Sequence, residues 1–115
     1  MKYKISMDDK VFIQKLKEVV DFFANENFDA AIQKAKKLKE NIQNQDDIIL
    51  IENIIKIISS AQLINQQKLE EALSLLESSY NTLKNYRPNY KGLKIENLLQ
   101  SVNQSIIDIK SLIKK

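Results

Sequence analysis

The sequence predicts an all-α protein: a single-domain bundle of about five helices, built as two αα-hairpins and a closing C-terminal helix. Three observations support this prediction. The chain has 115 residues, enough for one modest core. Its apolar residues recur at helical spacing, with almost no competing strand pattern. Its only Pro, Pro88, and its only Gly, Gly92, lie close together, so the chain on either side lacks the strongest helix breakers. The domain is expected to span residues 1–115, with residues 1–7 as a flexible N-terminus.

The first helix is expected from about Asp8 to Ala24, and the second from Phe28 to about Ile42. Asp8 and Asp9 are expected to cap the first helix and to place negative charge in its first turn. The expected inner faces of the two helices consist of Phe12, Leu16, Val19, Val20 and Phe23, and of Phe28, Ala31, Ile32, Ala35, Leu38 and Ile42.

A third helix is expected to begin at a cap on Asp46 or Asp47 and to end at Ile64. Its apolar arc is about 200° wide on a helical wheel, which requires contacts on several sides. The pattern therefore predicts that this is the central helix. Glu52 and Lys56 are expected to pair with each other, one turn apart, on its remaining solvent-facing strip.

The fourth helix is expected to follow Gln66 and to end near Tyr86, because Arg87 precedes Pro88 and is driven away from helical geometry. The fifth is expected over Ile95–Lys114, with a narrow apolar stripe. Between these two helices the sequence predicts a loop.

A short internal duplication supports the two hairpins. The segment ENFDAAIQKA at residues 26–35 is similar to QKLEEALSLL at residues 67–76. Each would begin the second helix of an αα-hairpin, as in tetratricopeptide-type units. Ala31 and Ala72 are 41 residues apart, whereas that repeat has a period of about 34. We therefore expect two hairpins packed side by side.

Residues 86–99, YRPNYKGLKIENLL, match the pattern Y-x-P-x-Y-x-G-L-D-x-x-x-L-L except at Lys94. Over Ile51–Ile109 the chain resembles the bacterial and archaeal family called domain of unknown function 309, a small all-helical bundle without an established activity. The family's A-H-E-x-x-E segment aligns with Ala30–Ala35, so its His and both Glu are missing here. A Gln and a later His of the family align with Lys56 and Leu63. The resemblance thus implies the fold but no inherited site, and Lys94 in place of Asp implies a poorly capped last helix.

Composition excludes several classes of function. The chain has no Cys, His or Trp, which rules out thiolate nucleophiles, Ser/His/Asp triads and zinc sites built on Cys or His. Glu70, Glu71 and Glu77 lie on different sides of their helix, and the first two suit its first turn better than a metal site. We therefore expect no enzyme activity, no cofactor and no metal.

The N-terminus has no apolar run of signal-peptide length. The most apolar window, Ile48–Ile64, is interrupted by six polar or charged residues. A spanning helix needs roughly 20 nearly uninterrupted apolar residues. The sequence therefore predicts a cytoplasmic protein that does not enter the membrane, and the family resemblance implies a prokaryotic source.

The favoured function is a non-enzymatic protein-interaction or scaffold module, with a protein partner or a second copy bound on surplus apolar surface. The candidate surface residues are Phe22, Leu75, Tyr86, Tyr90, Ile107 and Leu112.

The corner from Tyr86 to Leu93 has two interpretations. Its two Tyr rings and Arg87 could converge on a ligand. Alternatively, Tyr86 and Tyr90 cover the end of the core, Pro88 ends the fourth helix and Gly92 adopts a positive φ. The packing interpretation is favoured, because aromatic residues in loops beside Pro and Gly usually pack.

An alternative function is nucleic-acid binding through Lys-rich helix faces, since the net charge is +3. Lys34, Lys36, Lys37 and Lys39 form the densest basic cluster. A solvated helix face is favoured there, because no aromatic residue is interleaved for base stacking.

Overall fold

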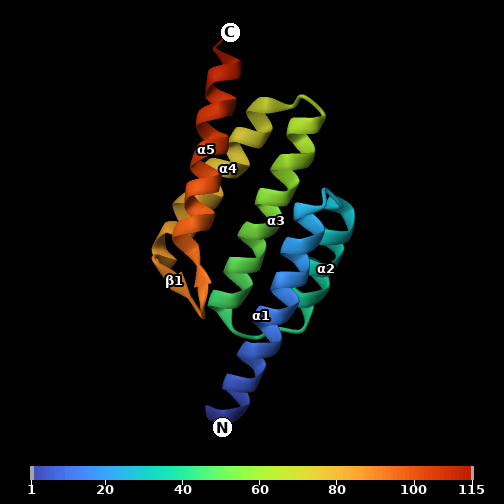
Figure 1. Cartoon of the computed structure of the whole chain (residues 1–115), viewed down its shortest axis with the longest axis vertical. Helices are drawn as coiled ribbons and strands as arrows, with labels where there is room; N and C mark the ends of the chain where they lie inside the picture. Colours follow the sequence, from blue (N-terminus) through green and yellow to red (C-terminus); the bar gives the residue numbers. More distant parts are fainter. Residues whose placement is uncertain (1, 115) are drawn as a thin grey trace.

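The computed structural model describes the backbone of residues 2–114 and the side chains of residues 9–114. It contains five α-helices, as predicted: α1 (Lys2–Ala24), α2 (Phe28–Glu40), α3 (Gln45–Asn65), α4 (Leu69–Leu83) and α5 (Ile95–Ile113) (Figure 1). A short 3-10 helix, η1 (Lys84–Tyr86), continues α4. Two strands of two residues each, β1 (Asn89–Tyr90) and β2 (Leu93–Lys94), precede α5. The all-α class, with two αα-hairpins and a closing helix, is confirmed.

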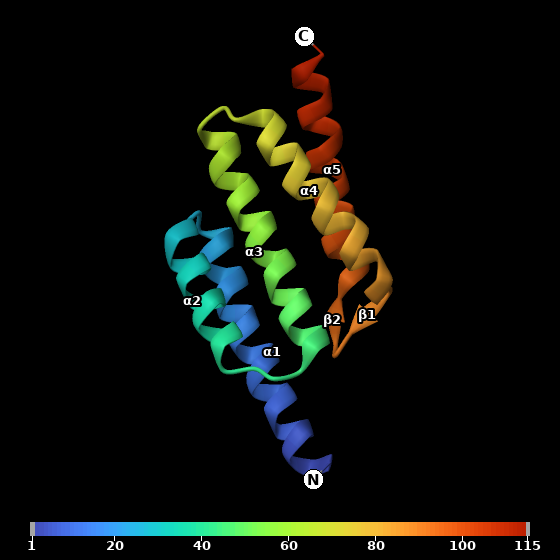
Figure 2. The ribbon, with the colours of Figure 1, turned by 180° about the vertical axis from the view of Figure 1, so that it is seen from behind.

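Each helix packs on the next one along the chain, so α1 contacts α2, α2 contacts α3, and so on to α5. Helices α1, α3 and α5 run in one direction, and α2 and α4 run in the other (Figures 1 and 2). Helix α3 lies between α1 and α5, while α5 extends past the turn that joins α3 to α4. The molecule is consequently elongated, with extents of 55 × 27 × 20 Å.

The two hairpin turns are built alike. Two residues after the end of the preceding helix, each turn has a residue with left-handed backbone, Glu26 at φ 61° and Gln67 at φ 62°. Ala31 and Ala72, which follow these turns, are both fully buried. The bond that closes each turn runs from Asn27 N to Phe22 O in the first and from Lys68 N to Leu63 O in the second, at 2.8 Å in both. This is the Schellman arrangement, and it repeats at the 41-residue offset of the sequence duplication.

Helix α3 is central, as predicted, with eight buried residues. The expected pairing of Glu52 with Lys56 along this helix is wrong. Glu52 instead accepts from Lys39 of α2 at 3.3 Å, and Lys56 donates to Ser78 of α4 at 3.0 Å. Both side chains therefore connect α3 to its neighbours, because the helices on its two sides bring partners within reach.

Two predicted helix starts need correction. Helix α1 begins at Lys2, so Asp8 and Asp9 lie in its interior and do not cap it. Helix α3 is capped by Asn44, whose Oδ1 accepts from the backbone N–H of Asp47 at 3.0 Å. Asp47 lies in the first turn and uses its carboxylate elsewhere. The flexibility expected for residues 1–7 stays a prediction, and Met1 lies outside the described residues.

The predicted loop between α4 and α5 contains a small antiparallel hairpin. Asn89 pairs with Lys94, and Tyr90 pairs with Leu93. The two residues between the strands both have positive φ, 50° at Lys91 and 86° at Gly92. That combination is the type I′ turn, which matches the twist of a two-residue hairpin. Gly92 thus adopts the predicted conformation, and the turn presents the Lys91 side chain to the bundle.

Candidate docking groove and the hairpin anchor at its end

An apolar groove of about 400 Å³ lies between α1 and α5, with α3 as its floor. We call it the α1/α3/α5 groove. Four helices and β2 contribute to its lining. The residues are Leu16, Val19, Val20 and Phe23 of α1, Leu50, Ile54, Ile57, Ile58, Ser60, Ala61 and Ile64 of α3, Leu76 of α4, Leu93 and Lys94 of β2, and Ile95, Leu98, Ser101, Val102 and Ser105 of α5.

The groove exists because α1 and α5 diverge over α3. Val20 shares the apolar face of α1, yet it is 47% exposed and lines the groove. Small residues line parts of the groove: Ala61 lies on the α3 floor, and Ser101 and Ser105 lie on the α5 wall. Small side chains let another backbone approach closely.

The groove carries little charge. Of the described residues that line it, only Lys94 is charged, and it lies where α5 begins. Lys17 lies three residues before Val20, one turn away on the neighbouring side of α1, and is exposed. The other end of α5 carries Asp108, whose carboxylate accepts from Gln104 at 3.0 Å.

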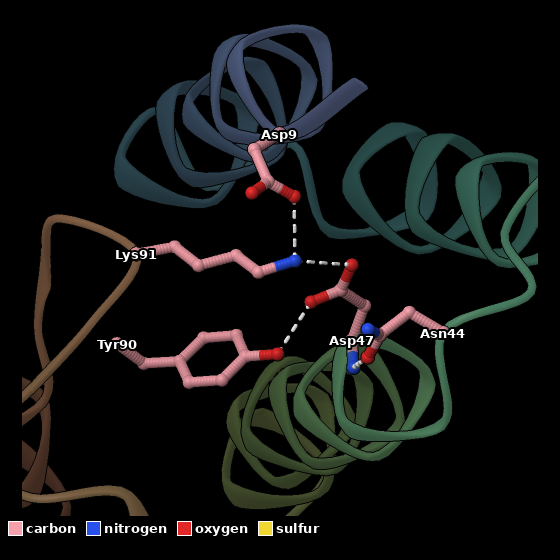
Figure 3. A network of polar contacts seen from close by, with 5 residues as sticks. All are labelled: Asp9, Asn44, Asp47, Tyr90 and Lys91. Carbon is pink, nitrogen blue, oxygen red and sulfur yellow. Dashed lines mark hydrogen bonds and ion pairs between the residues drawn. The ribbon is translucent and has the colours of Figure 1, made fainter. Parts of the chain in front are cut away.

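Close in the chain to the groove residues Leu50 and Leu93 lies a polar cluster that we call the hairpin anchor: Asp9, Asn44, Asp47, Tyr90 and Lys91 (Figure 3). The Lys91 ammonium lies between two carboxylates, 2.6 Å from Asp9 of α1 and 2.9 Å from Asp47 of α3. The Tyr90 hydroxyl donates to the other oxygen of Asp47 at 2.6 Å. Asp47 is 6% exposed, so its charge is balanced inside the protein. The anchor thereby joins the first helix, the central helix and the segment that starts α5.

The contacts within the anchor raise the pKa values of Lys91 and Tyr90. Burial would lower the pKa of Lys91, but the hydrogen bonds to Asp9 and Asp47 outweigh burial, and the pKa is raised. Burial raises the pKa of Tyr90, and the hydrogen bond to the Asp47 carboxylate raises it further. Both groups therefore keep their protons in the folded state. The Lys91 ammonium also lies 5.6 Å from the ring centres of Phe12 and Tyr90, a cation–π distance.

Two further residues, Tyr86 and Arg87, hold the corner that follows α4. Tyr86 donates from its hydroxyl to Asp46 at 3.0 Å, and its ring meets that of Tyr90 edge-on at 5.3 Å between centroids. Arg87 forms a bidentate pair with Glu96 in the first turn of α5, at 2.7 and 3.0 Å. Because the polar groups of Tyr86, Arg87 and Tyr90 all have partners within the chain, the geometry supports packing over ligand binding at this corner.

The structure separates the six predicted surface residues. Ile107 and Leu112 are 51% and 52% exposed. Phe22, Leu75, Tyr86 and Tyr90 are half-buried, and Phe22, Tyr86 and Tyr90 pack against the core. Leu112 follows Ser105 by seven residues and so continues the face of α5 that lines the groove, whereas Ile107 lies on another face. The prediction omitted Val20, Ser101 and Ser105, and also Lys91 of the anchor.

The predicted basic cluster on α2 is partly neutralised. Lys34 lies 2.6 Å from Glu18, and Lys39 lies 3.3 Å from Glu52. Lys34 and Lys37 also border a wider, polar hollow beside the anchor, together with Lys15 of α1. Its remaining cation, Lys91, is already paired with Asp9 and Asp47.

Within the described part of the chain, no group of three or more acidic side chains is placed to hold a metal ion. None of the described helices combines the length and the apolarity needed to cross a membrane. In comparisons with protein-family models, curated proteins and solved structures, nothing matches the chain. The resemblance to domain of unknown function 309 therefore stays a prediction.

Proposed function

We propose that this protein is a non-enzymatic interaction module that binds another protein in the α1/α3/α5 groove. The observation that carries the proposal is the groove itself, a largely uncharged hollow of about 400 Å³ in which Val20 is half-exposed. Stacked helical hairpins commonly use such concave faces for binding. Contiguous exposed apolar surface on a small protein often marks an interaction site.

The hairpin anchor supports this role by holding the groove open at a defined width. Lys91 connects α1, through Asp9, to the segment from which α5 starts. The two helices that form the groove walls are thereby fixed at one end. A pre-formed groove loses little conformational entropy when a partner binds.

The alternative, nucleic-acid binding through lysines, has weaker support. Lys34 and Lys39 are engaged with Glu18 and Glu52, which reduces the positive charge of α2. Binding that falls steeply with added salt would favour this alternative.

Site-specific photo-crosslinking tests the proposal. A photoreactive residue at Ser101 lies in the groove, and one at Gln104 lies on an exposed outer part of the same helix. In cells of the source organism, the Ser101 probe should yield an adduct with a partner protein that the Gln104 probe does not yield. Equal adducts at both positions would contradict the proposal, as would no adduct at Ser101.

A matched pair of variants on α1 provides the control. Val20→Asp places a charge in the groove, and Val11→Asp places one outside it at nearly equal exposure, 47% against 50%. Circular dichroism should show that both variants fold. The Ser101 adduct should be lost with Val20→Asp and retained with Val11→Asp.

A further inference from the structure

Resting on the proposed function, we infer that the occupant of the α1/α3/α5 groove is an amphipathic helix of a different protein, with acidic residues at the end that lies beside Lys17 and Lys94. The apolar lining of the groove indicates that the occupant is a helix. The lysines beside the groove indicate that this helix carries acidic residues.

The occupant is a helix because the groove offers few hydrogen-bonding partners. Nearly all of its lining residues are apolar, and its hydroxyls are those of Ser60, Ser101 and Ser105. Ser60 already donates to the backbone oxygen of Ile57 at 2.6 Å. An extended peptide would place unpaired N–H and C=O groups against this surface, which is costly. A helix satisfies its own backbone groups and presents only side chains.

The dimensions agree with a short helix. The α5 wall of the groove runs from Ile95 to Ser105, about 15 Å at 1.5 Å per residue. That distance corresponds to about three turns of a docked helix. Ala61, Ser101 and Ser105 allow its backbone to come close to the floor and to the α5 wall.

The charges at the hairpin end of the groove are positive. Lys94 lines the groove, Lys17 directly follows the lining residue Leu16 on α1, and both lysines are exposed. Among the described side chains neither lies within ion-pair distance of a carboxylate. Asp9 of α1 is already held by Lys91. Carboxylates on the partner helix would complement these two cations.

The same charges disfavour a second copy of this chain. The apolar residues left exposed at the end of α5, Leu112 and Ile113, are accompanied by Lys114 and by Lys110, which lies 3.4 Å from Glu77. This basic segment would be repelled by Lys17 and Lys94 of another copy. The fitting occupant is therefore a different chain with an acidic flank.

Two synthetic helical peptides test the inference. Both have about 15 residues, long enough to cover the groove, and share one Leu/Ala stripe. One carries Glu on its polar face and the other carries Lys. By fluorescence anisotropy at low salt, the acidic peptide should bind about fivefold or more tightly than the basic one, as expected for two exposed charge pairs. The ratio should shrink as salt is added.

Charge reversal provides the decisive comparison. The double variant Lys17→Glu/Lys94→Glu should reverse the preference toward the basic peptide. The control Lys36→Glu/Lys84→Glu changes the net charge equally at two exposed positions outside the groove, and should keep the preference of the wild type.

Each other outcome overturns the inference in a different way. If both peptides bind equally, and Val20→Asp abolishes binding while Val11→Asp does not, the acidic preference fails and the groove function stands. If binding of either peptide is unaffected by Val20→Asp, or if neither peptide binds, the groove function fails as well. A wild-type dimer that dissociates in Val20→Asp, measured by light scattering, would identify the occupant as a second copy.

Discussion

Lys91 connects three parts of the chain that are far apart in sequence. Its ammonium contacts Asp9 and Asp47, and its neighbour Tyr90 donates to the same Asp47 carboxylate. The left-handed backbone at Lys91 directs the side chain toward the bundle. A buried carboxylate is stable only when it is paired and hydrogen-bonded. Asp47 therefore depends on Lys91 and Tyr90 together with the cap at Asn44.

Replacing Lys91 by Met should lower the free energy of unfolding by about 1–3 kcal/mol, because Asp47 loses its cation while remaining buried. Chemical denaturation measures this change. The control Lys84→Met, at an exposed site, should stay within about 0.5 kcal/mol of the wild type. Adding Asp47→Asn to Lys91→Met should recover part of the loss. A denaturation midpoint equal to that of the control would show that the anchor contributes nothing.

Alkaline pH gives a second measurement on the same residues. The ordinary pKa values are 10.0 for Tyr and 10.5 for Lys, and both are raised in the folded protein. The folded state therefore holds these protons more tightly than the unfolded state. Their stabilising contribution is complete below about pH 10, and it is lost as pH rises through the folded pKa values. The decline in stability above that pH should be shallower in Lys91→Met combined with Tyr90→Phe.

At the scale of single elements, the ends of the helices differ in how they are capped. Helix α3 has a side-chain cap at Asn44 and two first-turn acids, Asp46 and Asp47. Helix α5 begins at Ile95 and follows Lys94, whose side chain makes no capping bond, as the family resemblance implied. The N–H of Glu96 is satisfied by the backbone oxygen of Pro88 at 3.2 Å. The first turn of α5 is thus only partly stabilised.

Lys94→Asp should raise the free energy of unfolding by about 0.5–1 kcal/mol, the lower part of the usual capping range, because the Glu96 N–H already has a partner. An Asp carboxylate would accept from the next free N–H and would suit the positive end of the helix dipole. Denaturant titration beside Lys94→Ala separates the added acceptor from the removed cation. A gain of equal size in Lys94→Ala would show that charge alone is responsible.

Periodicity predicted the elements well, because a helix that buries one face must repeat its apolar residues along that face. Phe28 and Ile95 were placed correctly as helix starts. The residue that caps α3 was harder to predict, because Asn and Asp are both common at helix starts. Asn44 is the cap, whereas the Asp47 carboxylate pairs with Tyr90 and Lys91, which are distant in the sequence. The β1–β2 hairpin was missed, because two-residue strands carry no periodic pattern.

The docking groove could be predicted only in part. Val20 has the spacing of a core residue, and its exposure depends on how far α5 lies from α1, a distance that no local pattern specifies. Ile107 and Leu112 were correctly expected on the surface, but the sequence did not show that they lie on different faces relative to the groove. Asp9 and Lys91 are brought together by the tertiary fold, across 82 positions of the chain.

At the scale of the whole molecule, the bundle is an open array of helices that follow one another in chain order. Each helix packs on the next, and the first helices of the two hairpins share one side with α5. An array of this kind leaves a concave face that its own helices do not fill. The anchor fixes the two walls of that face at one end. The central claim is therefore that a partner binds in the α1/α3/α5 groove.

The most direct measurement is a two-dimensional NMR titration of the isotope-labelled protein with whichever of the two helical peptides binds more tightly. The backbone amides of Val20, Ala61, Ser101 and Ser105 should show the largest shifts, and those of Val11, Lys36 and Ile107 should stay close to their free positions. Largest shifts on the Lys-rich face of α2, or around Ile107, would contradict the claim that the groove is the binding surface.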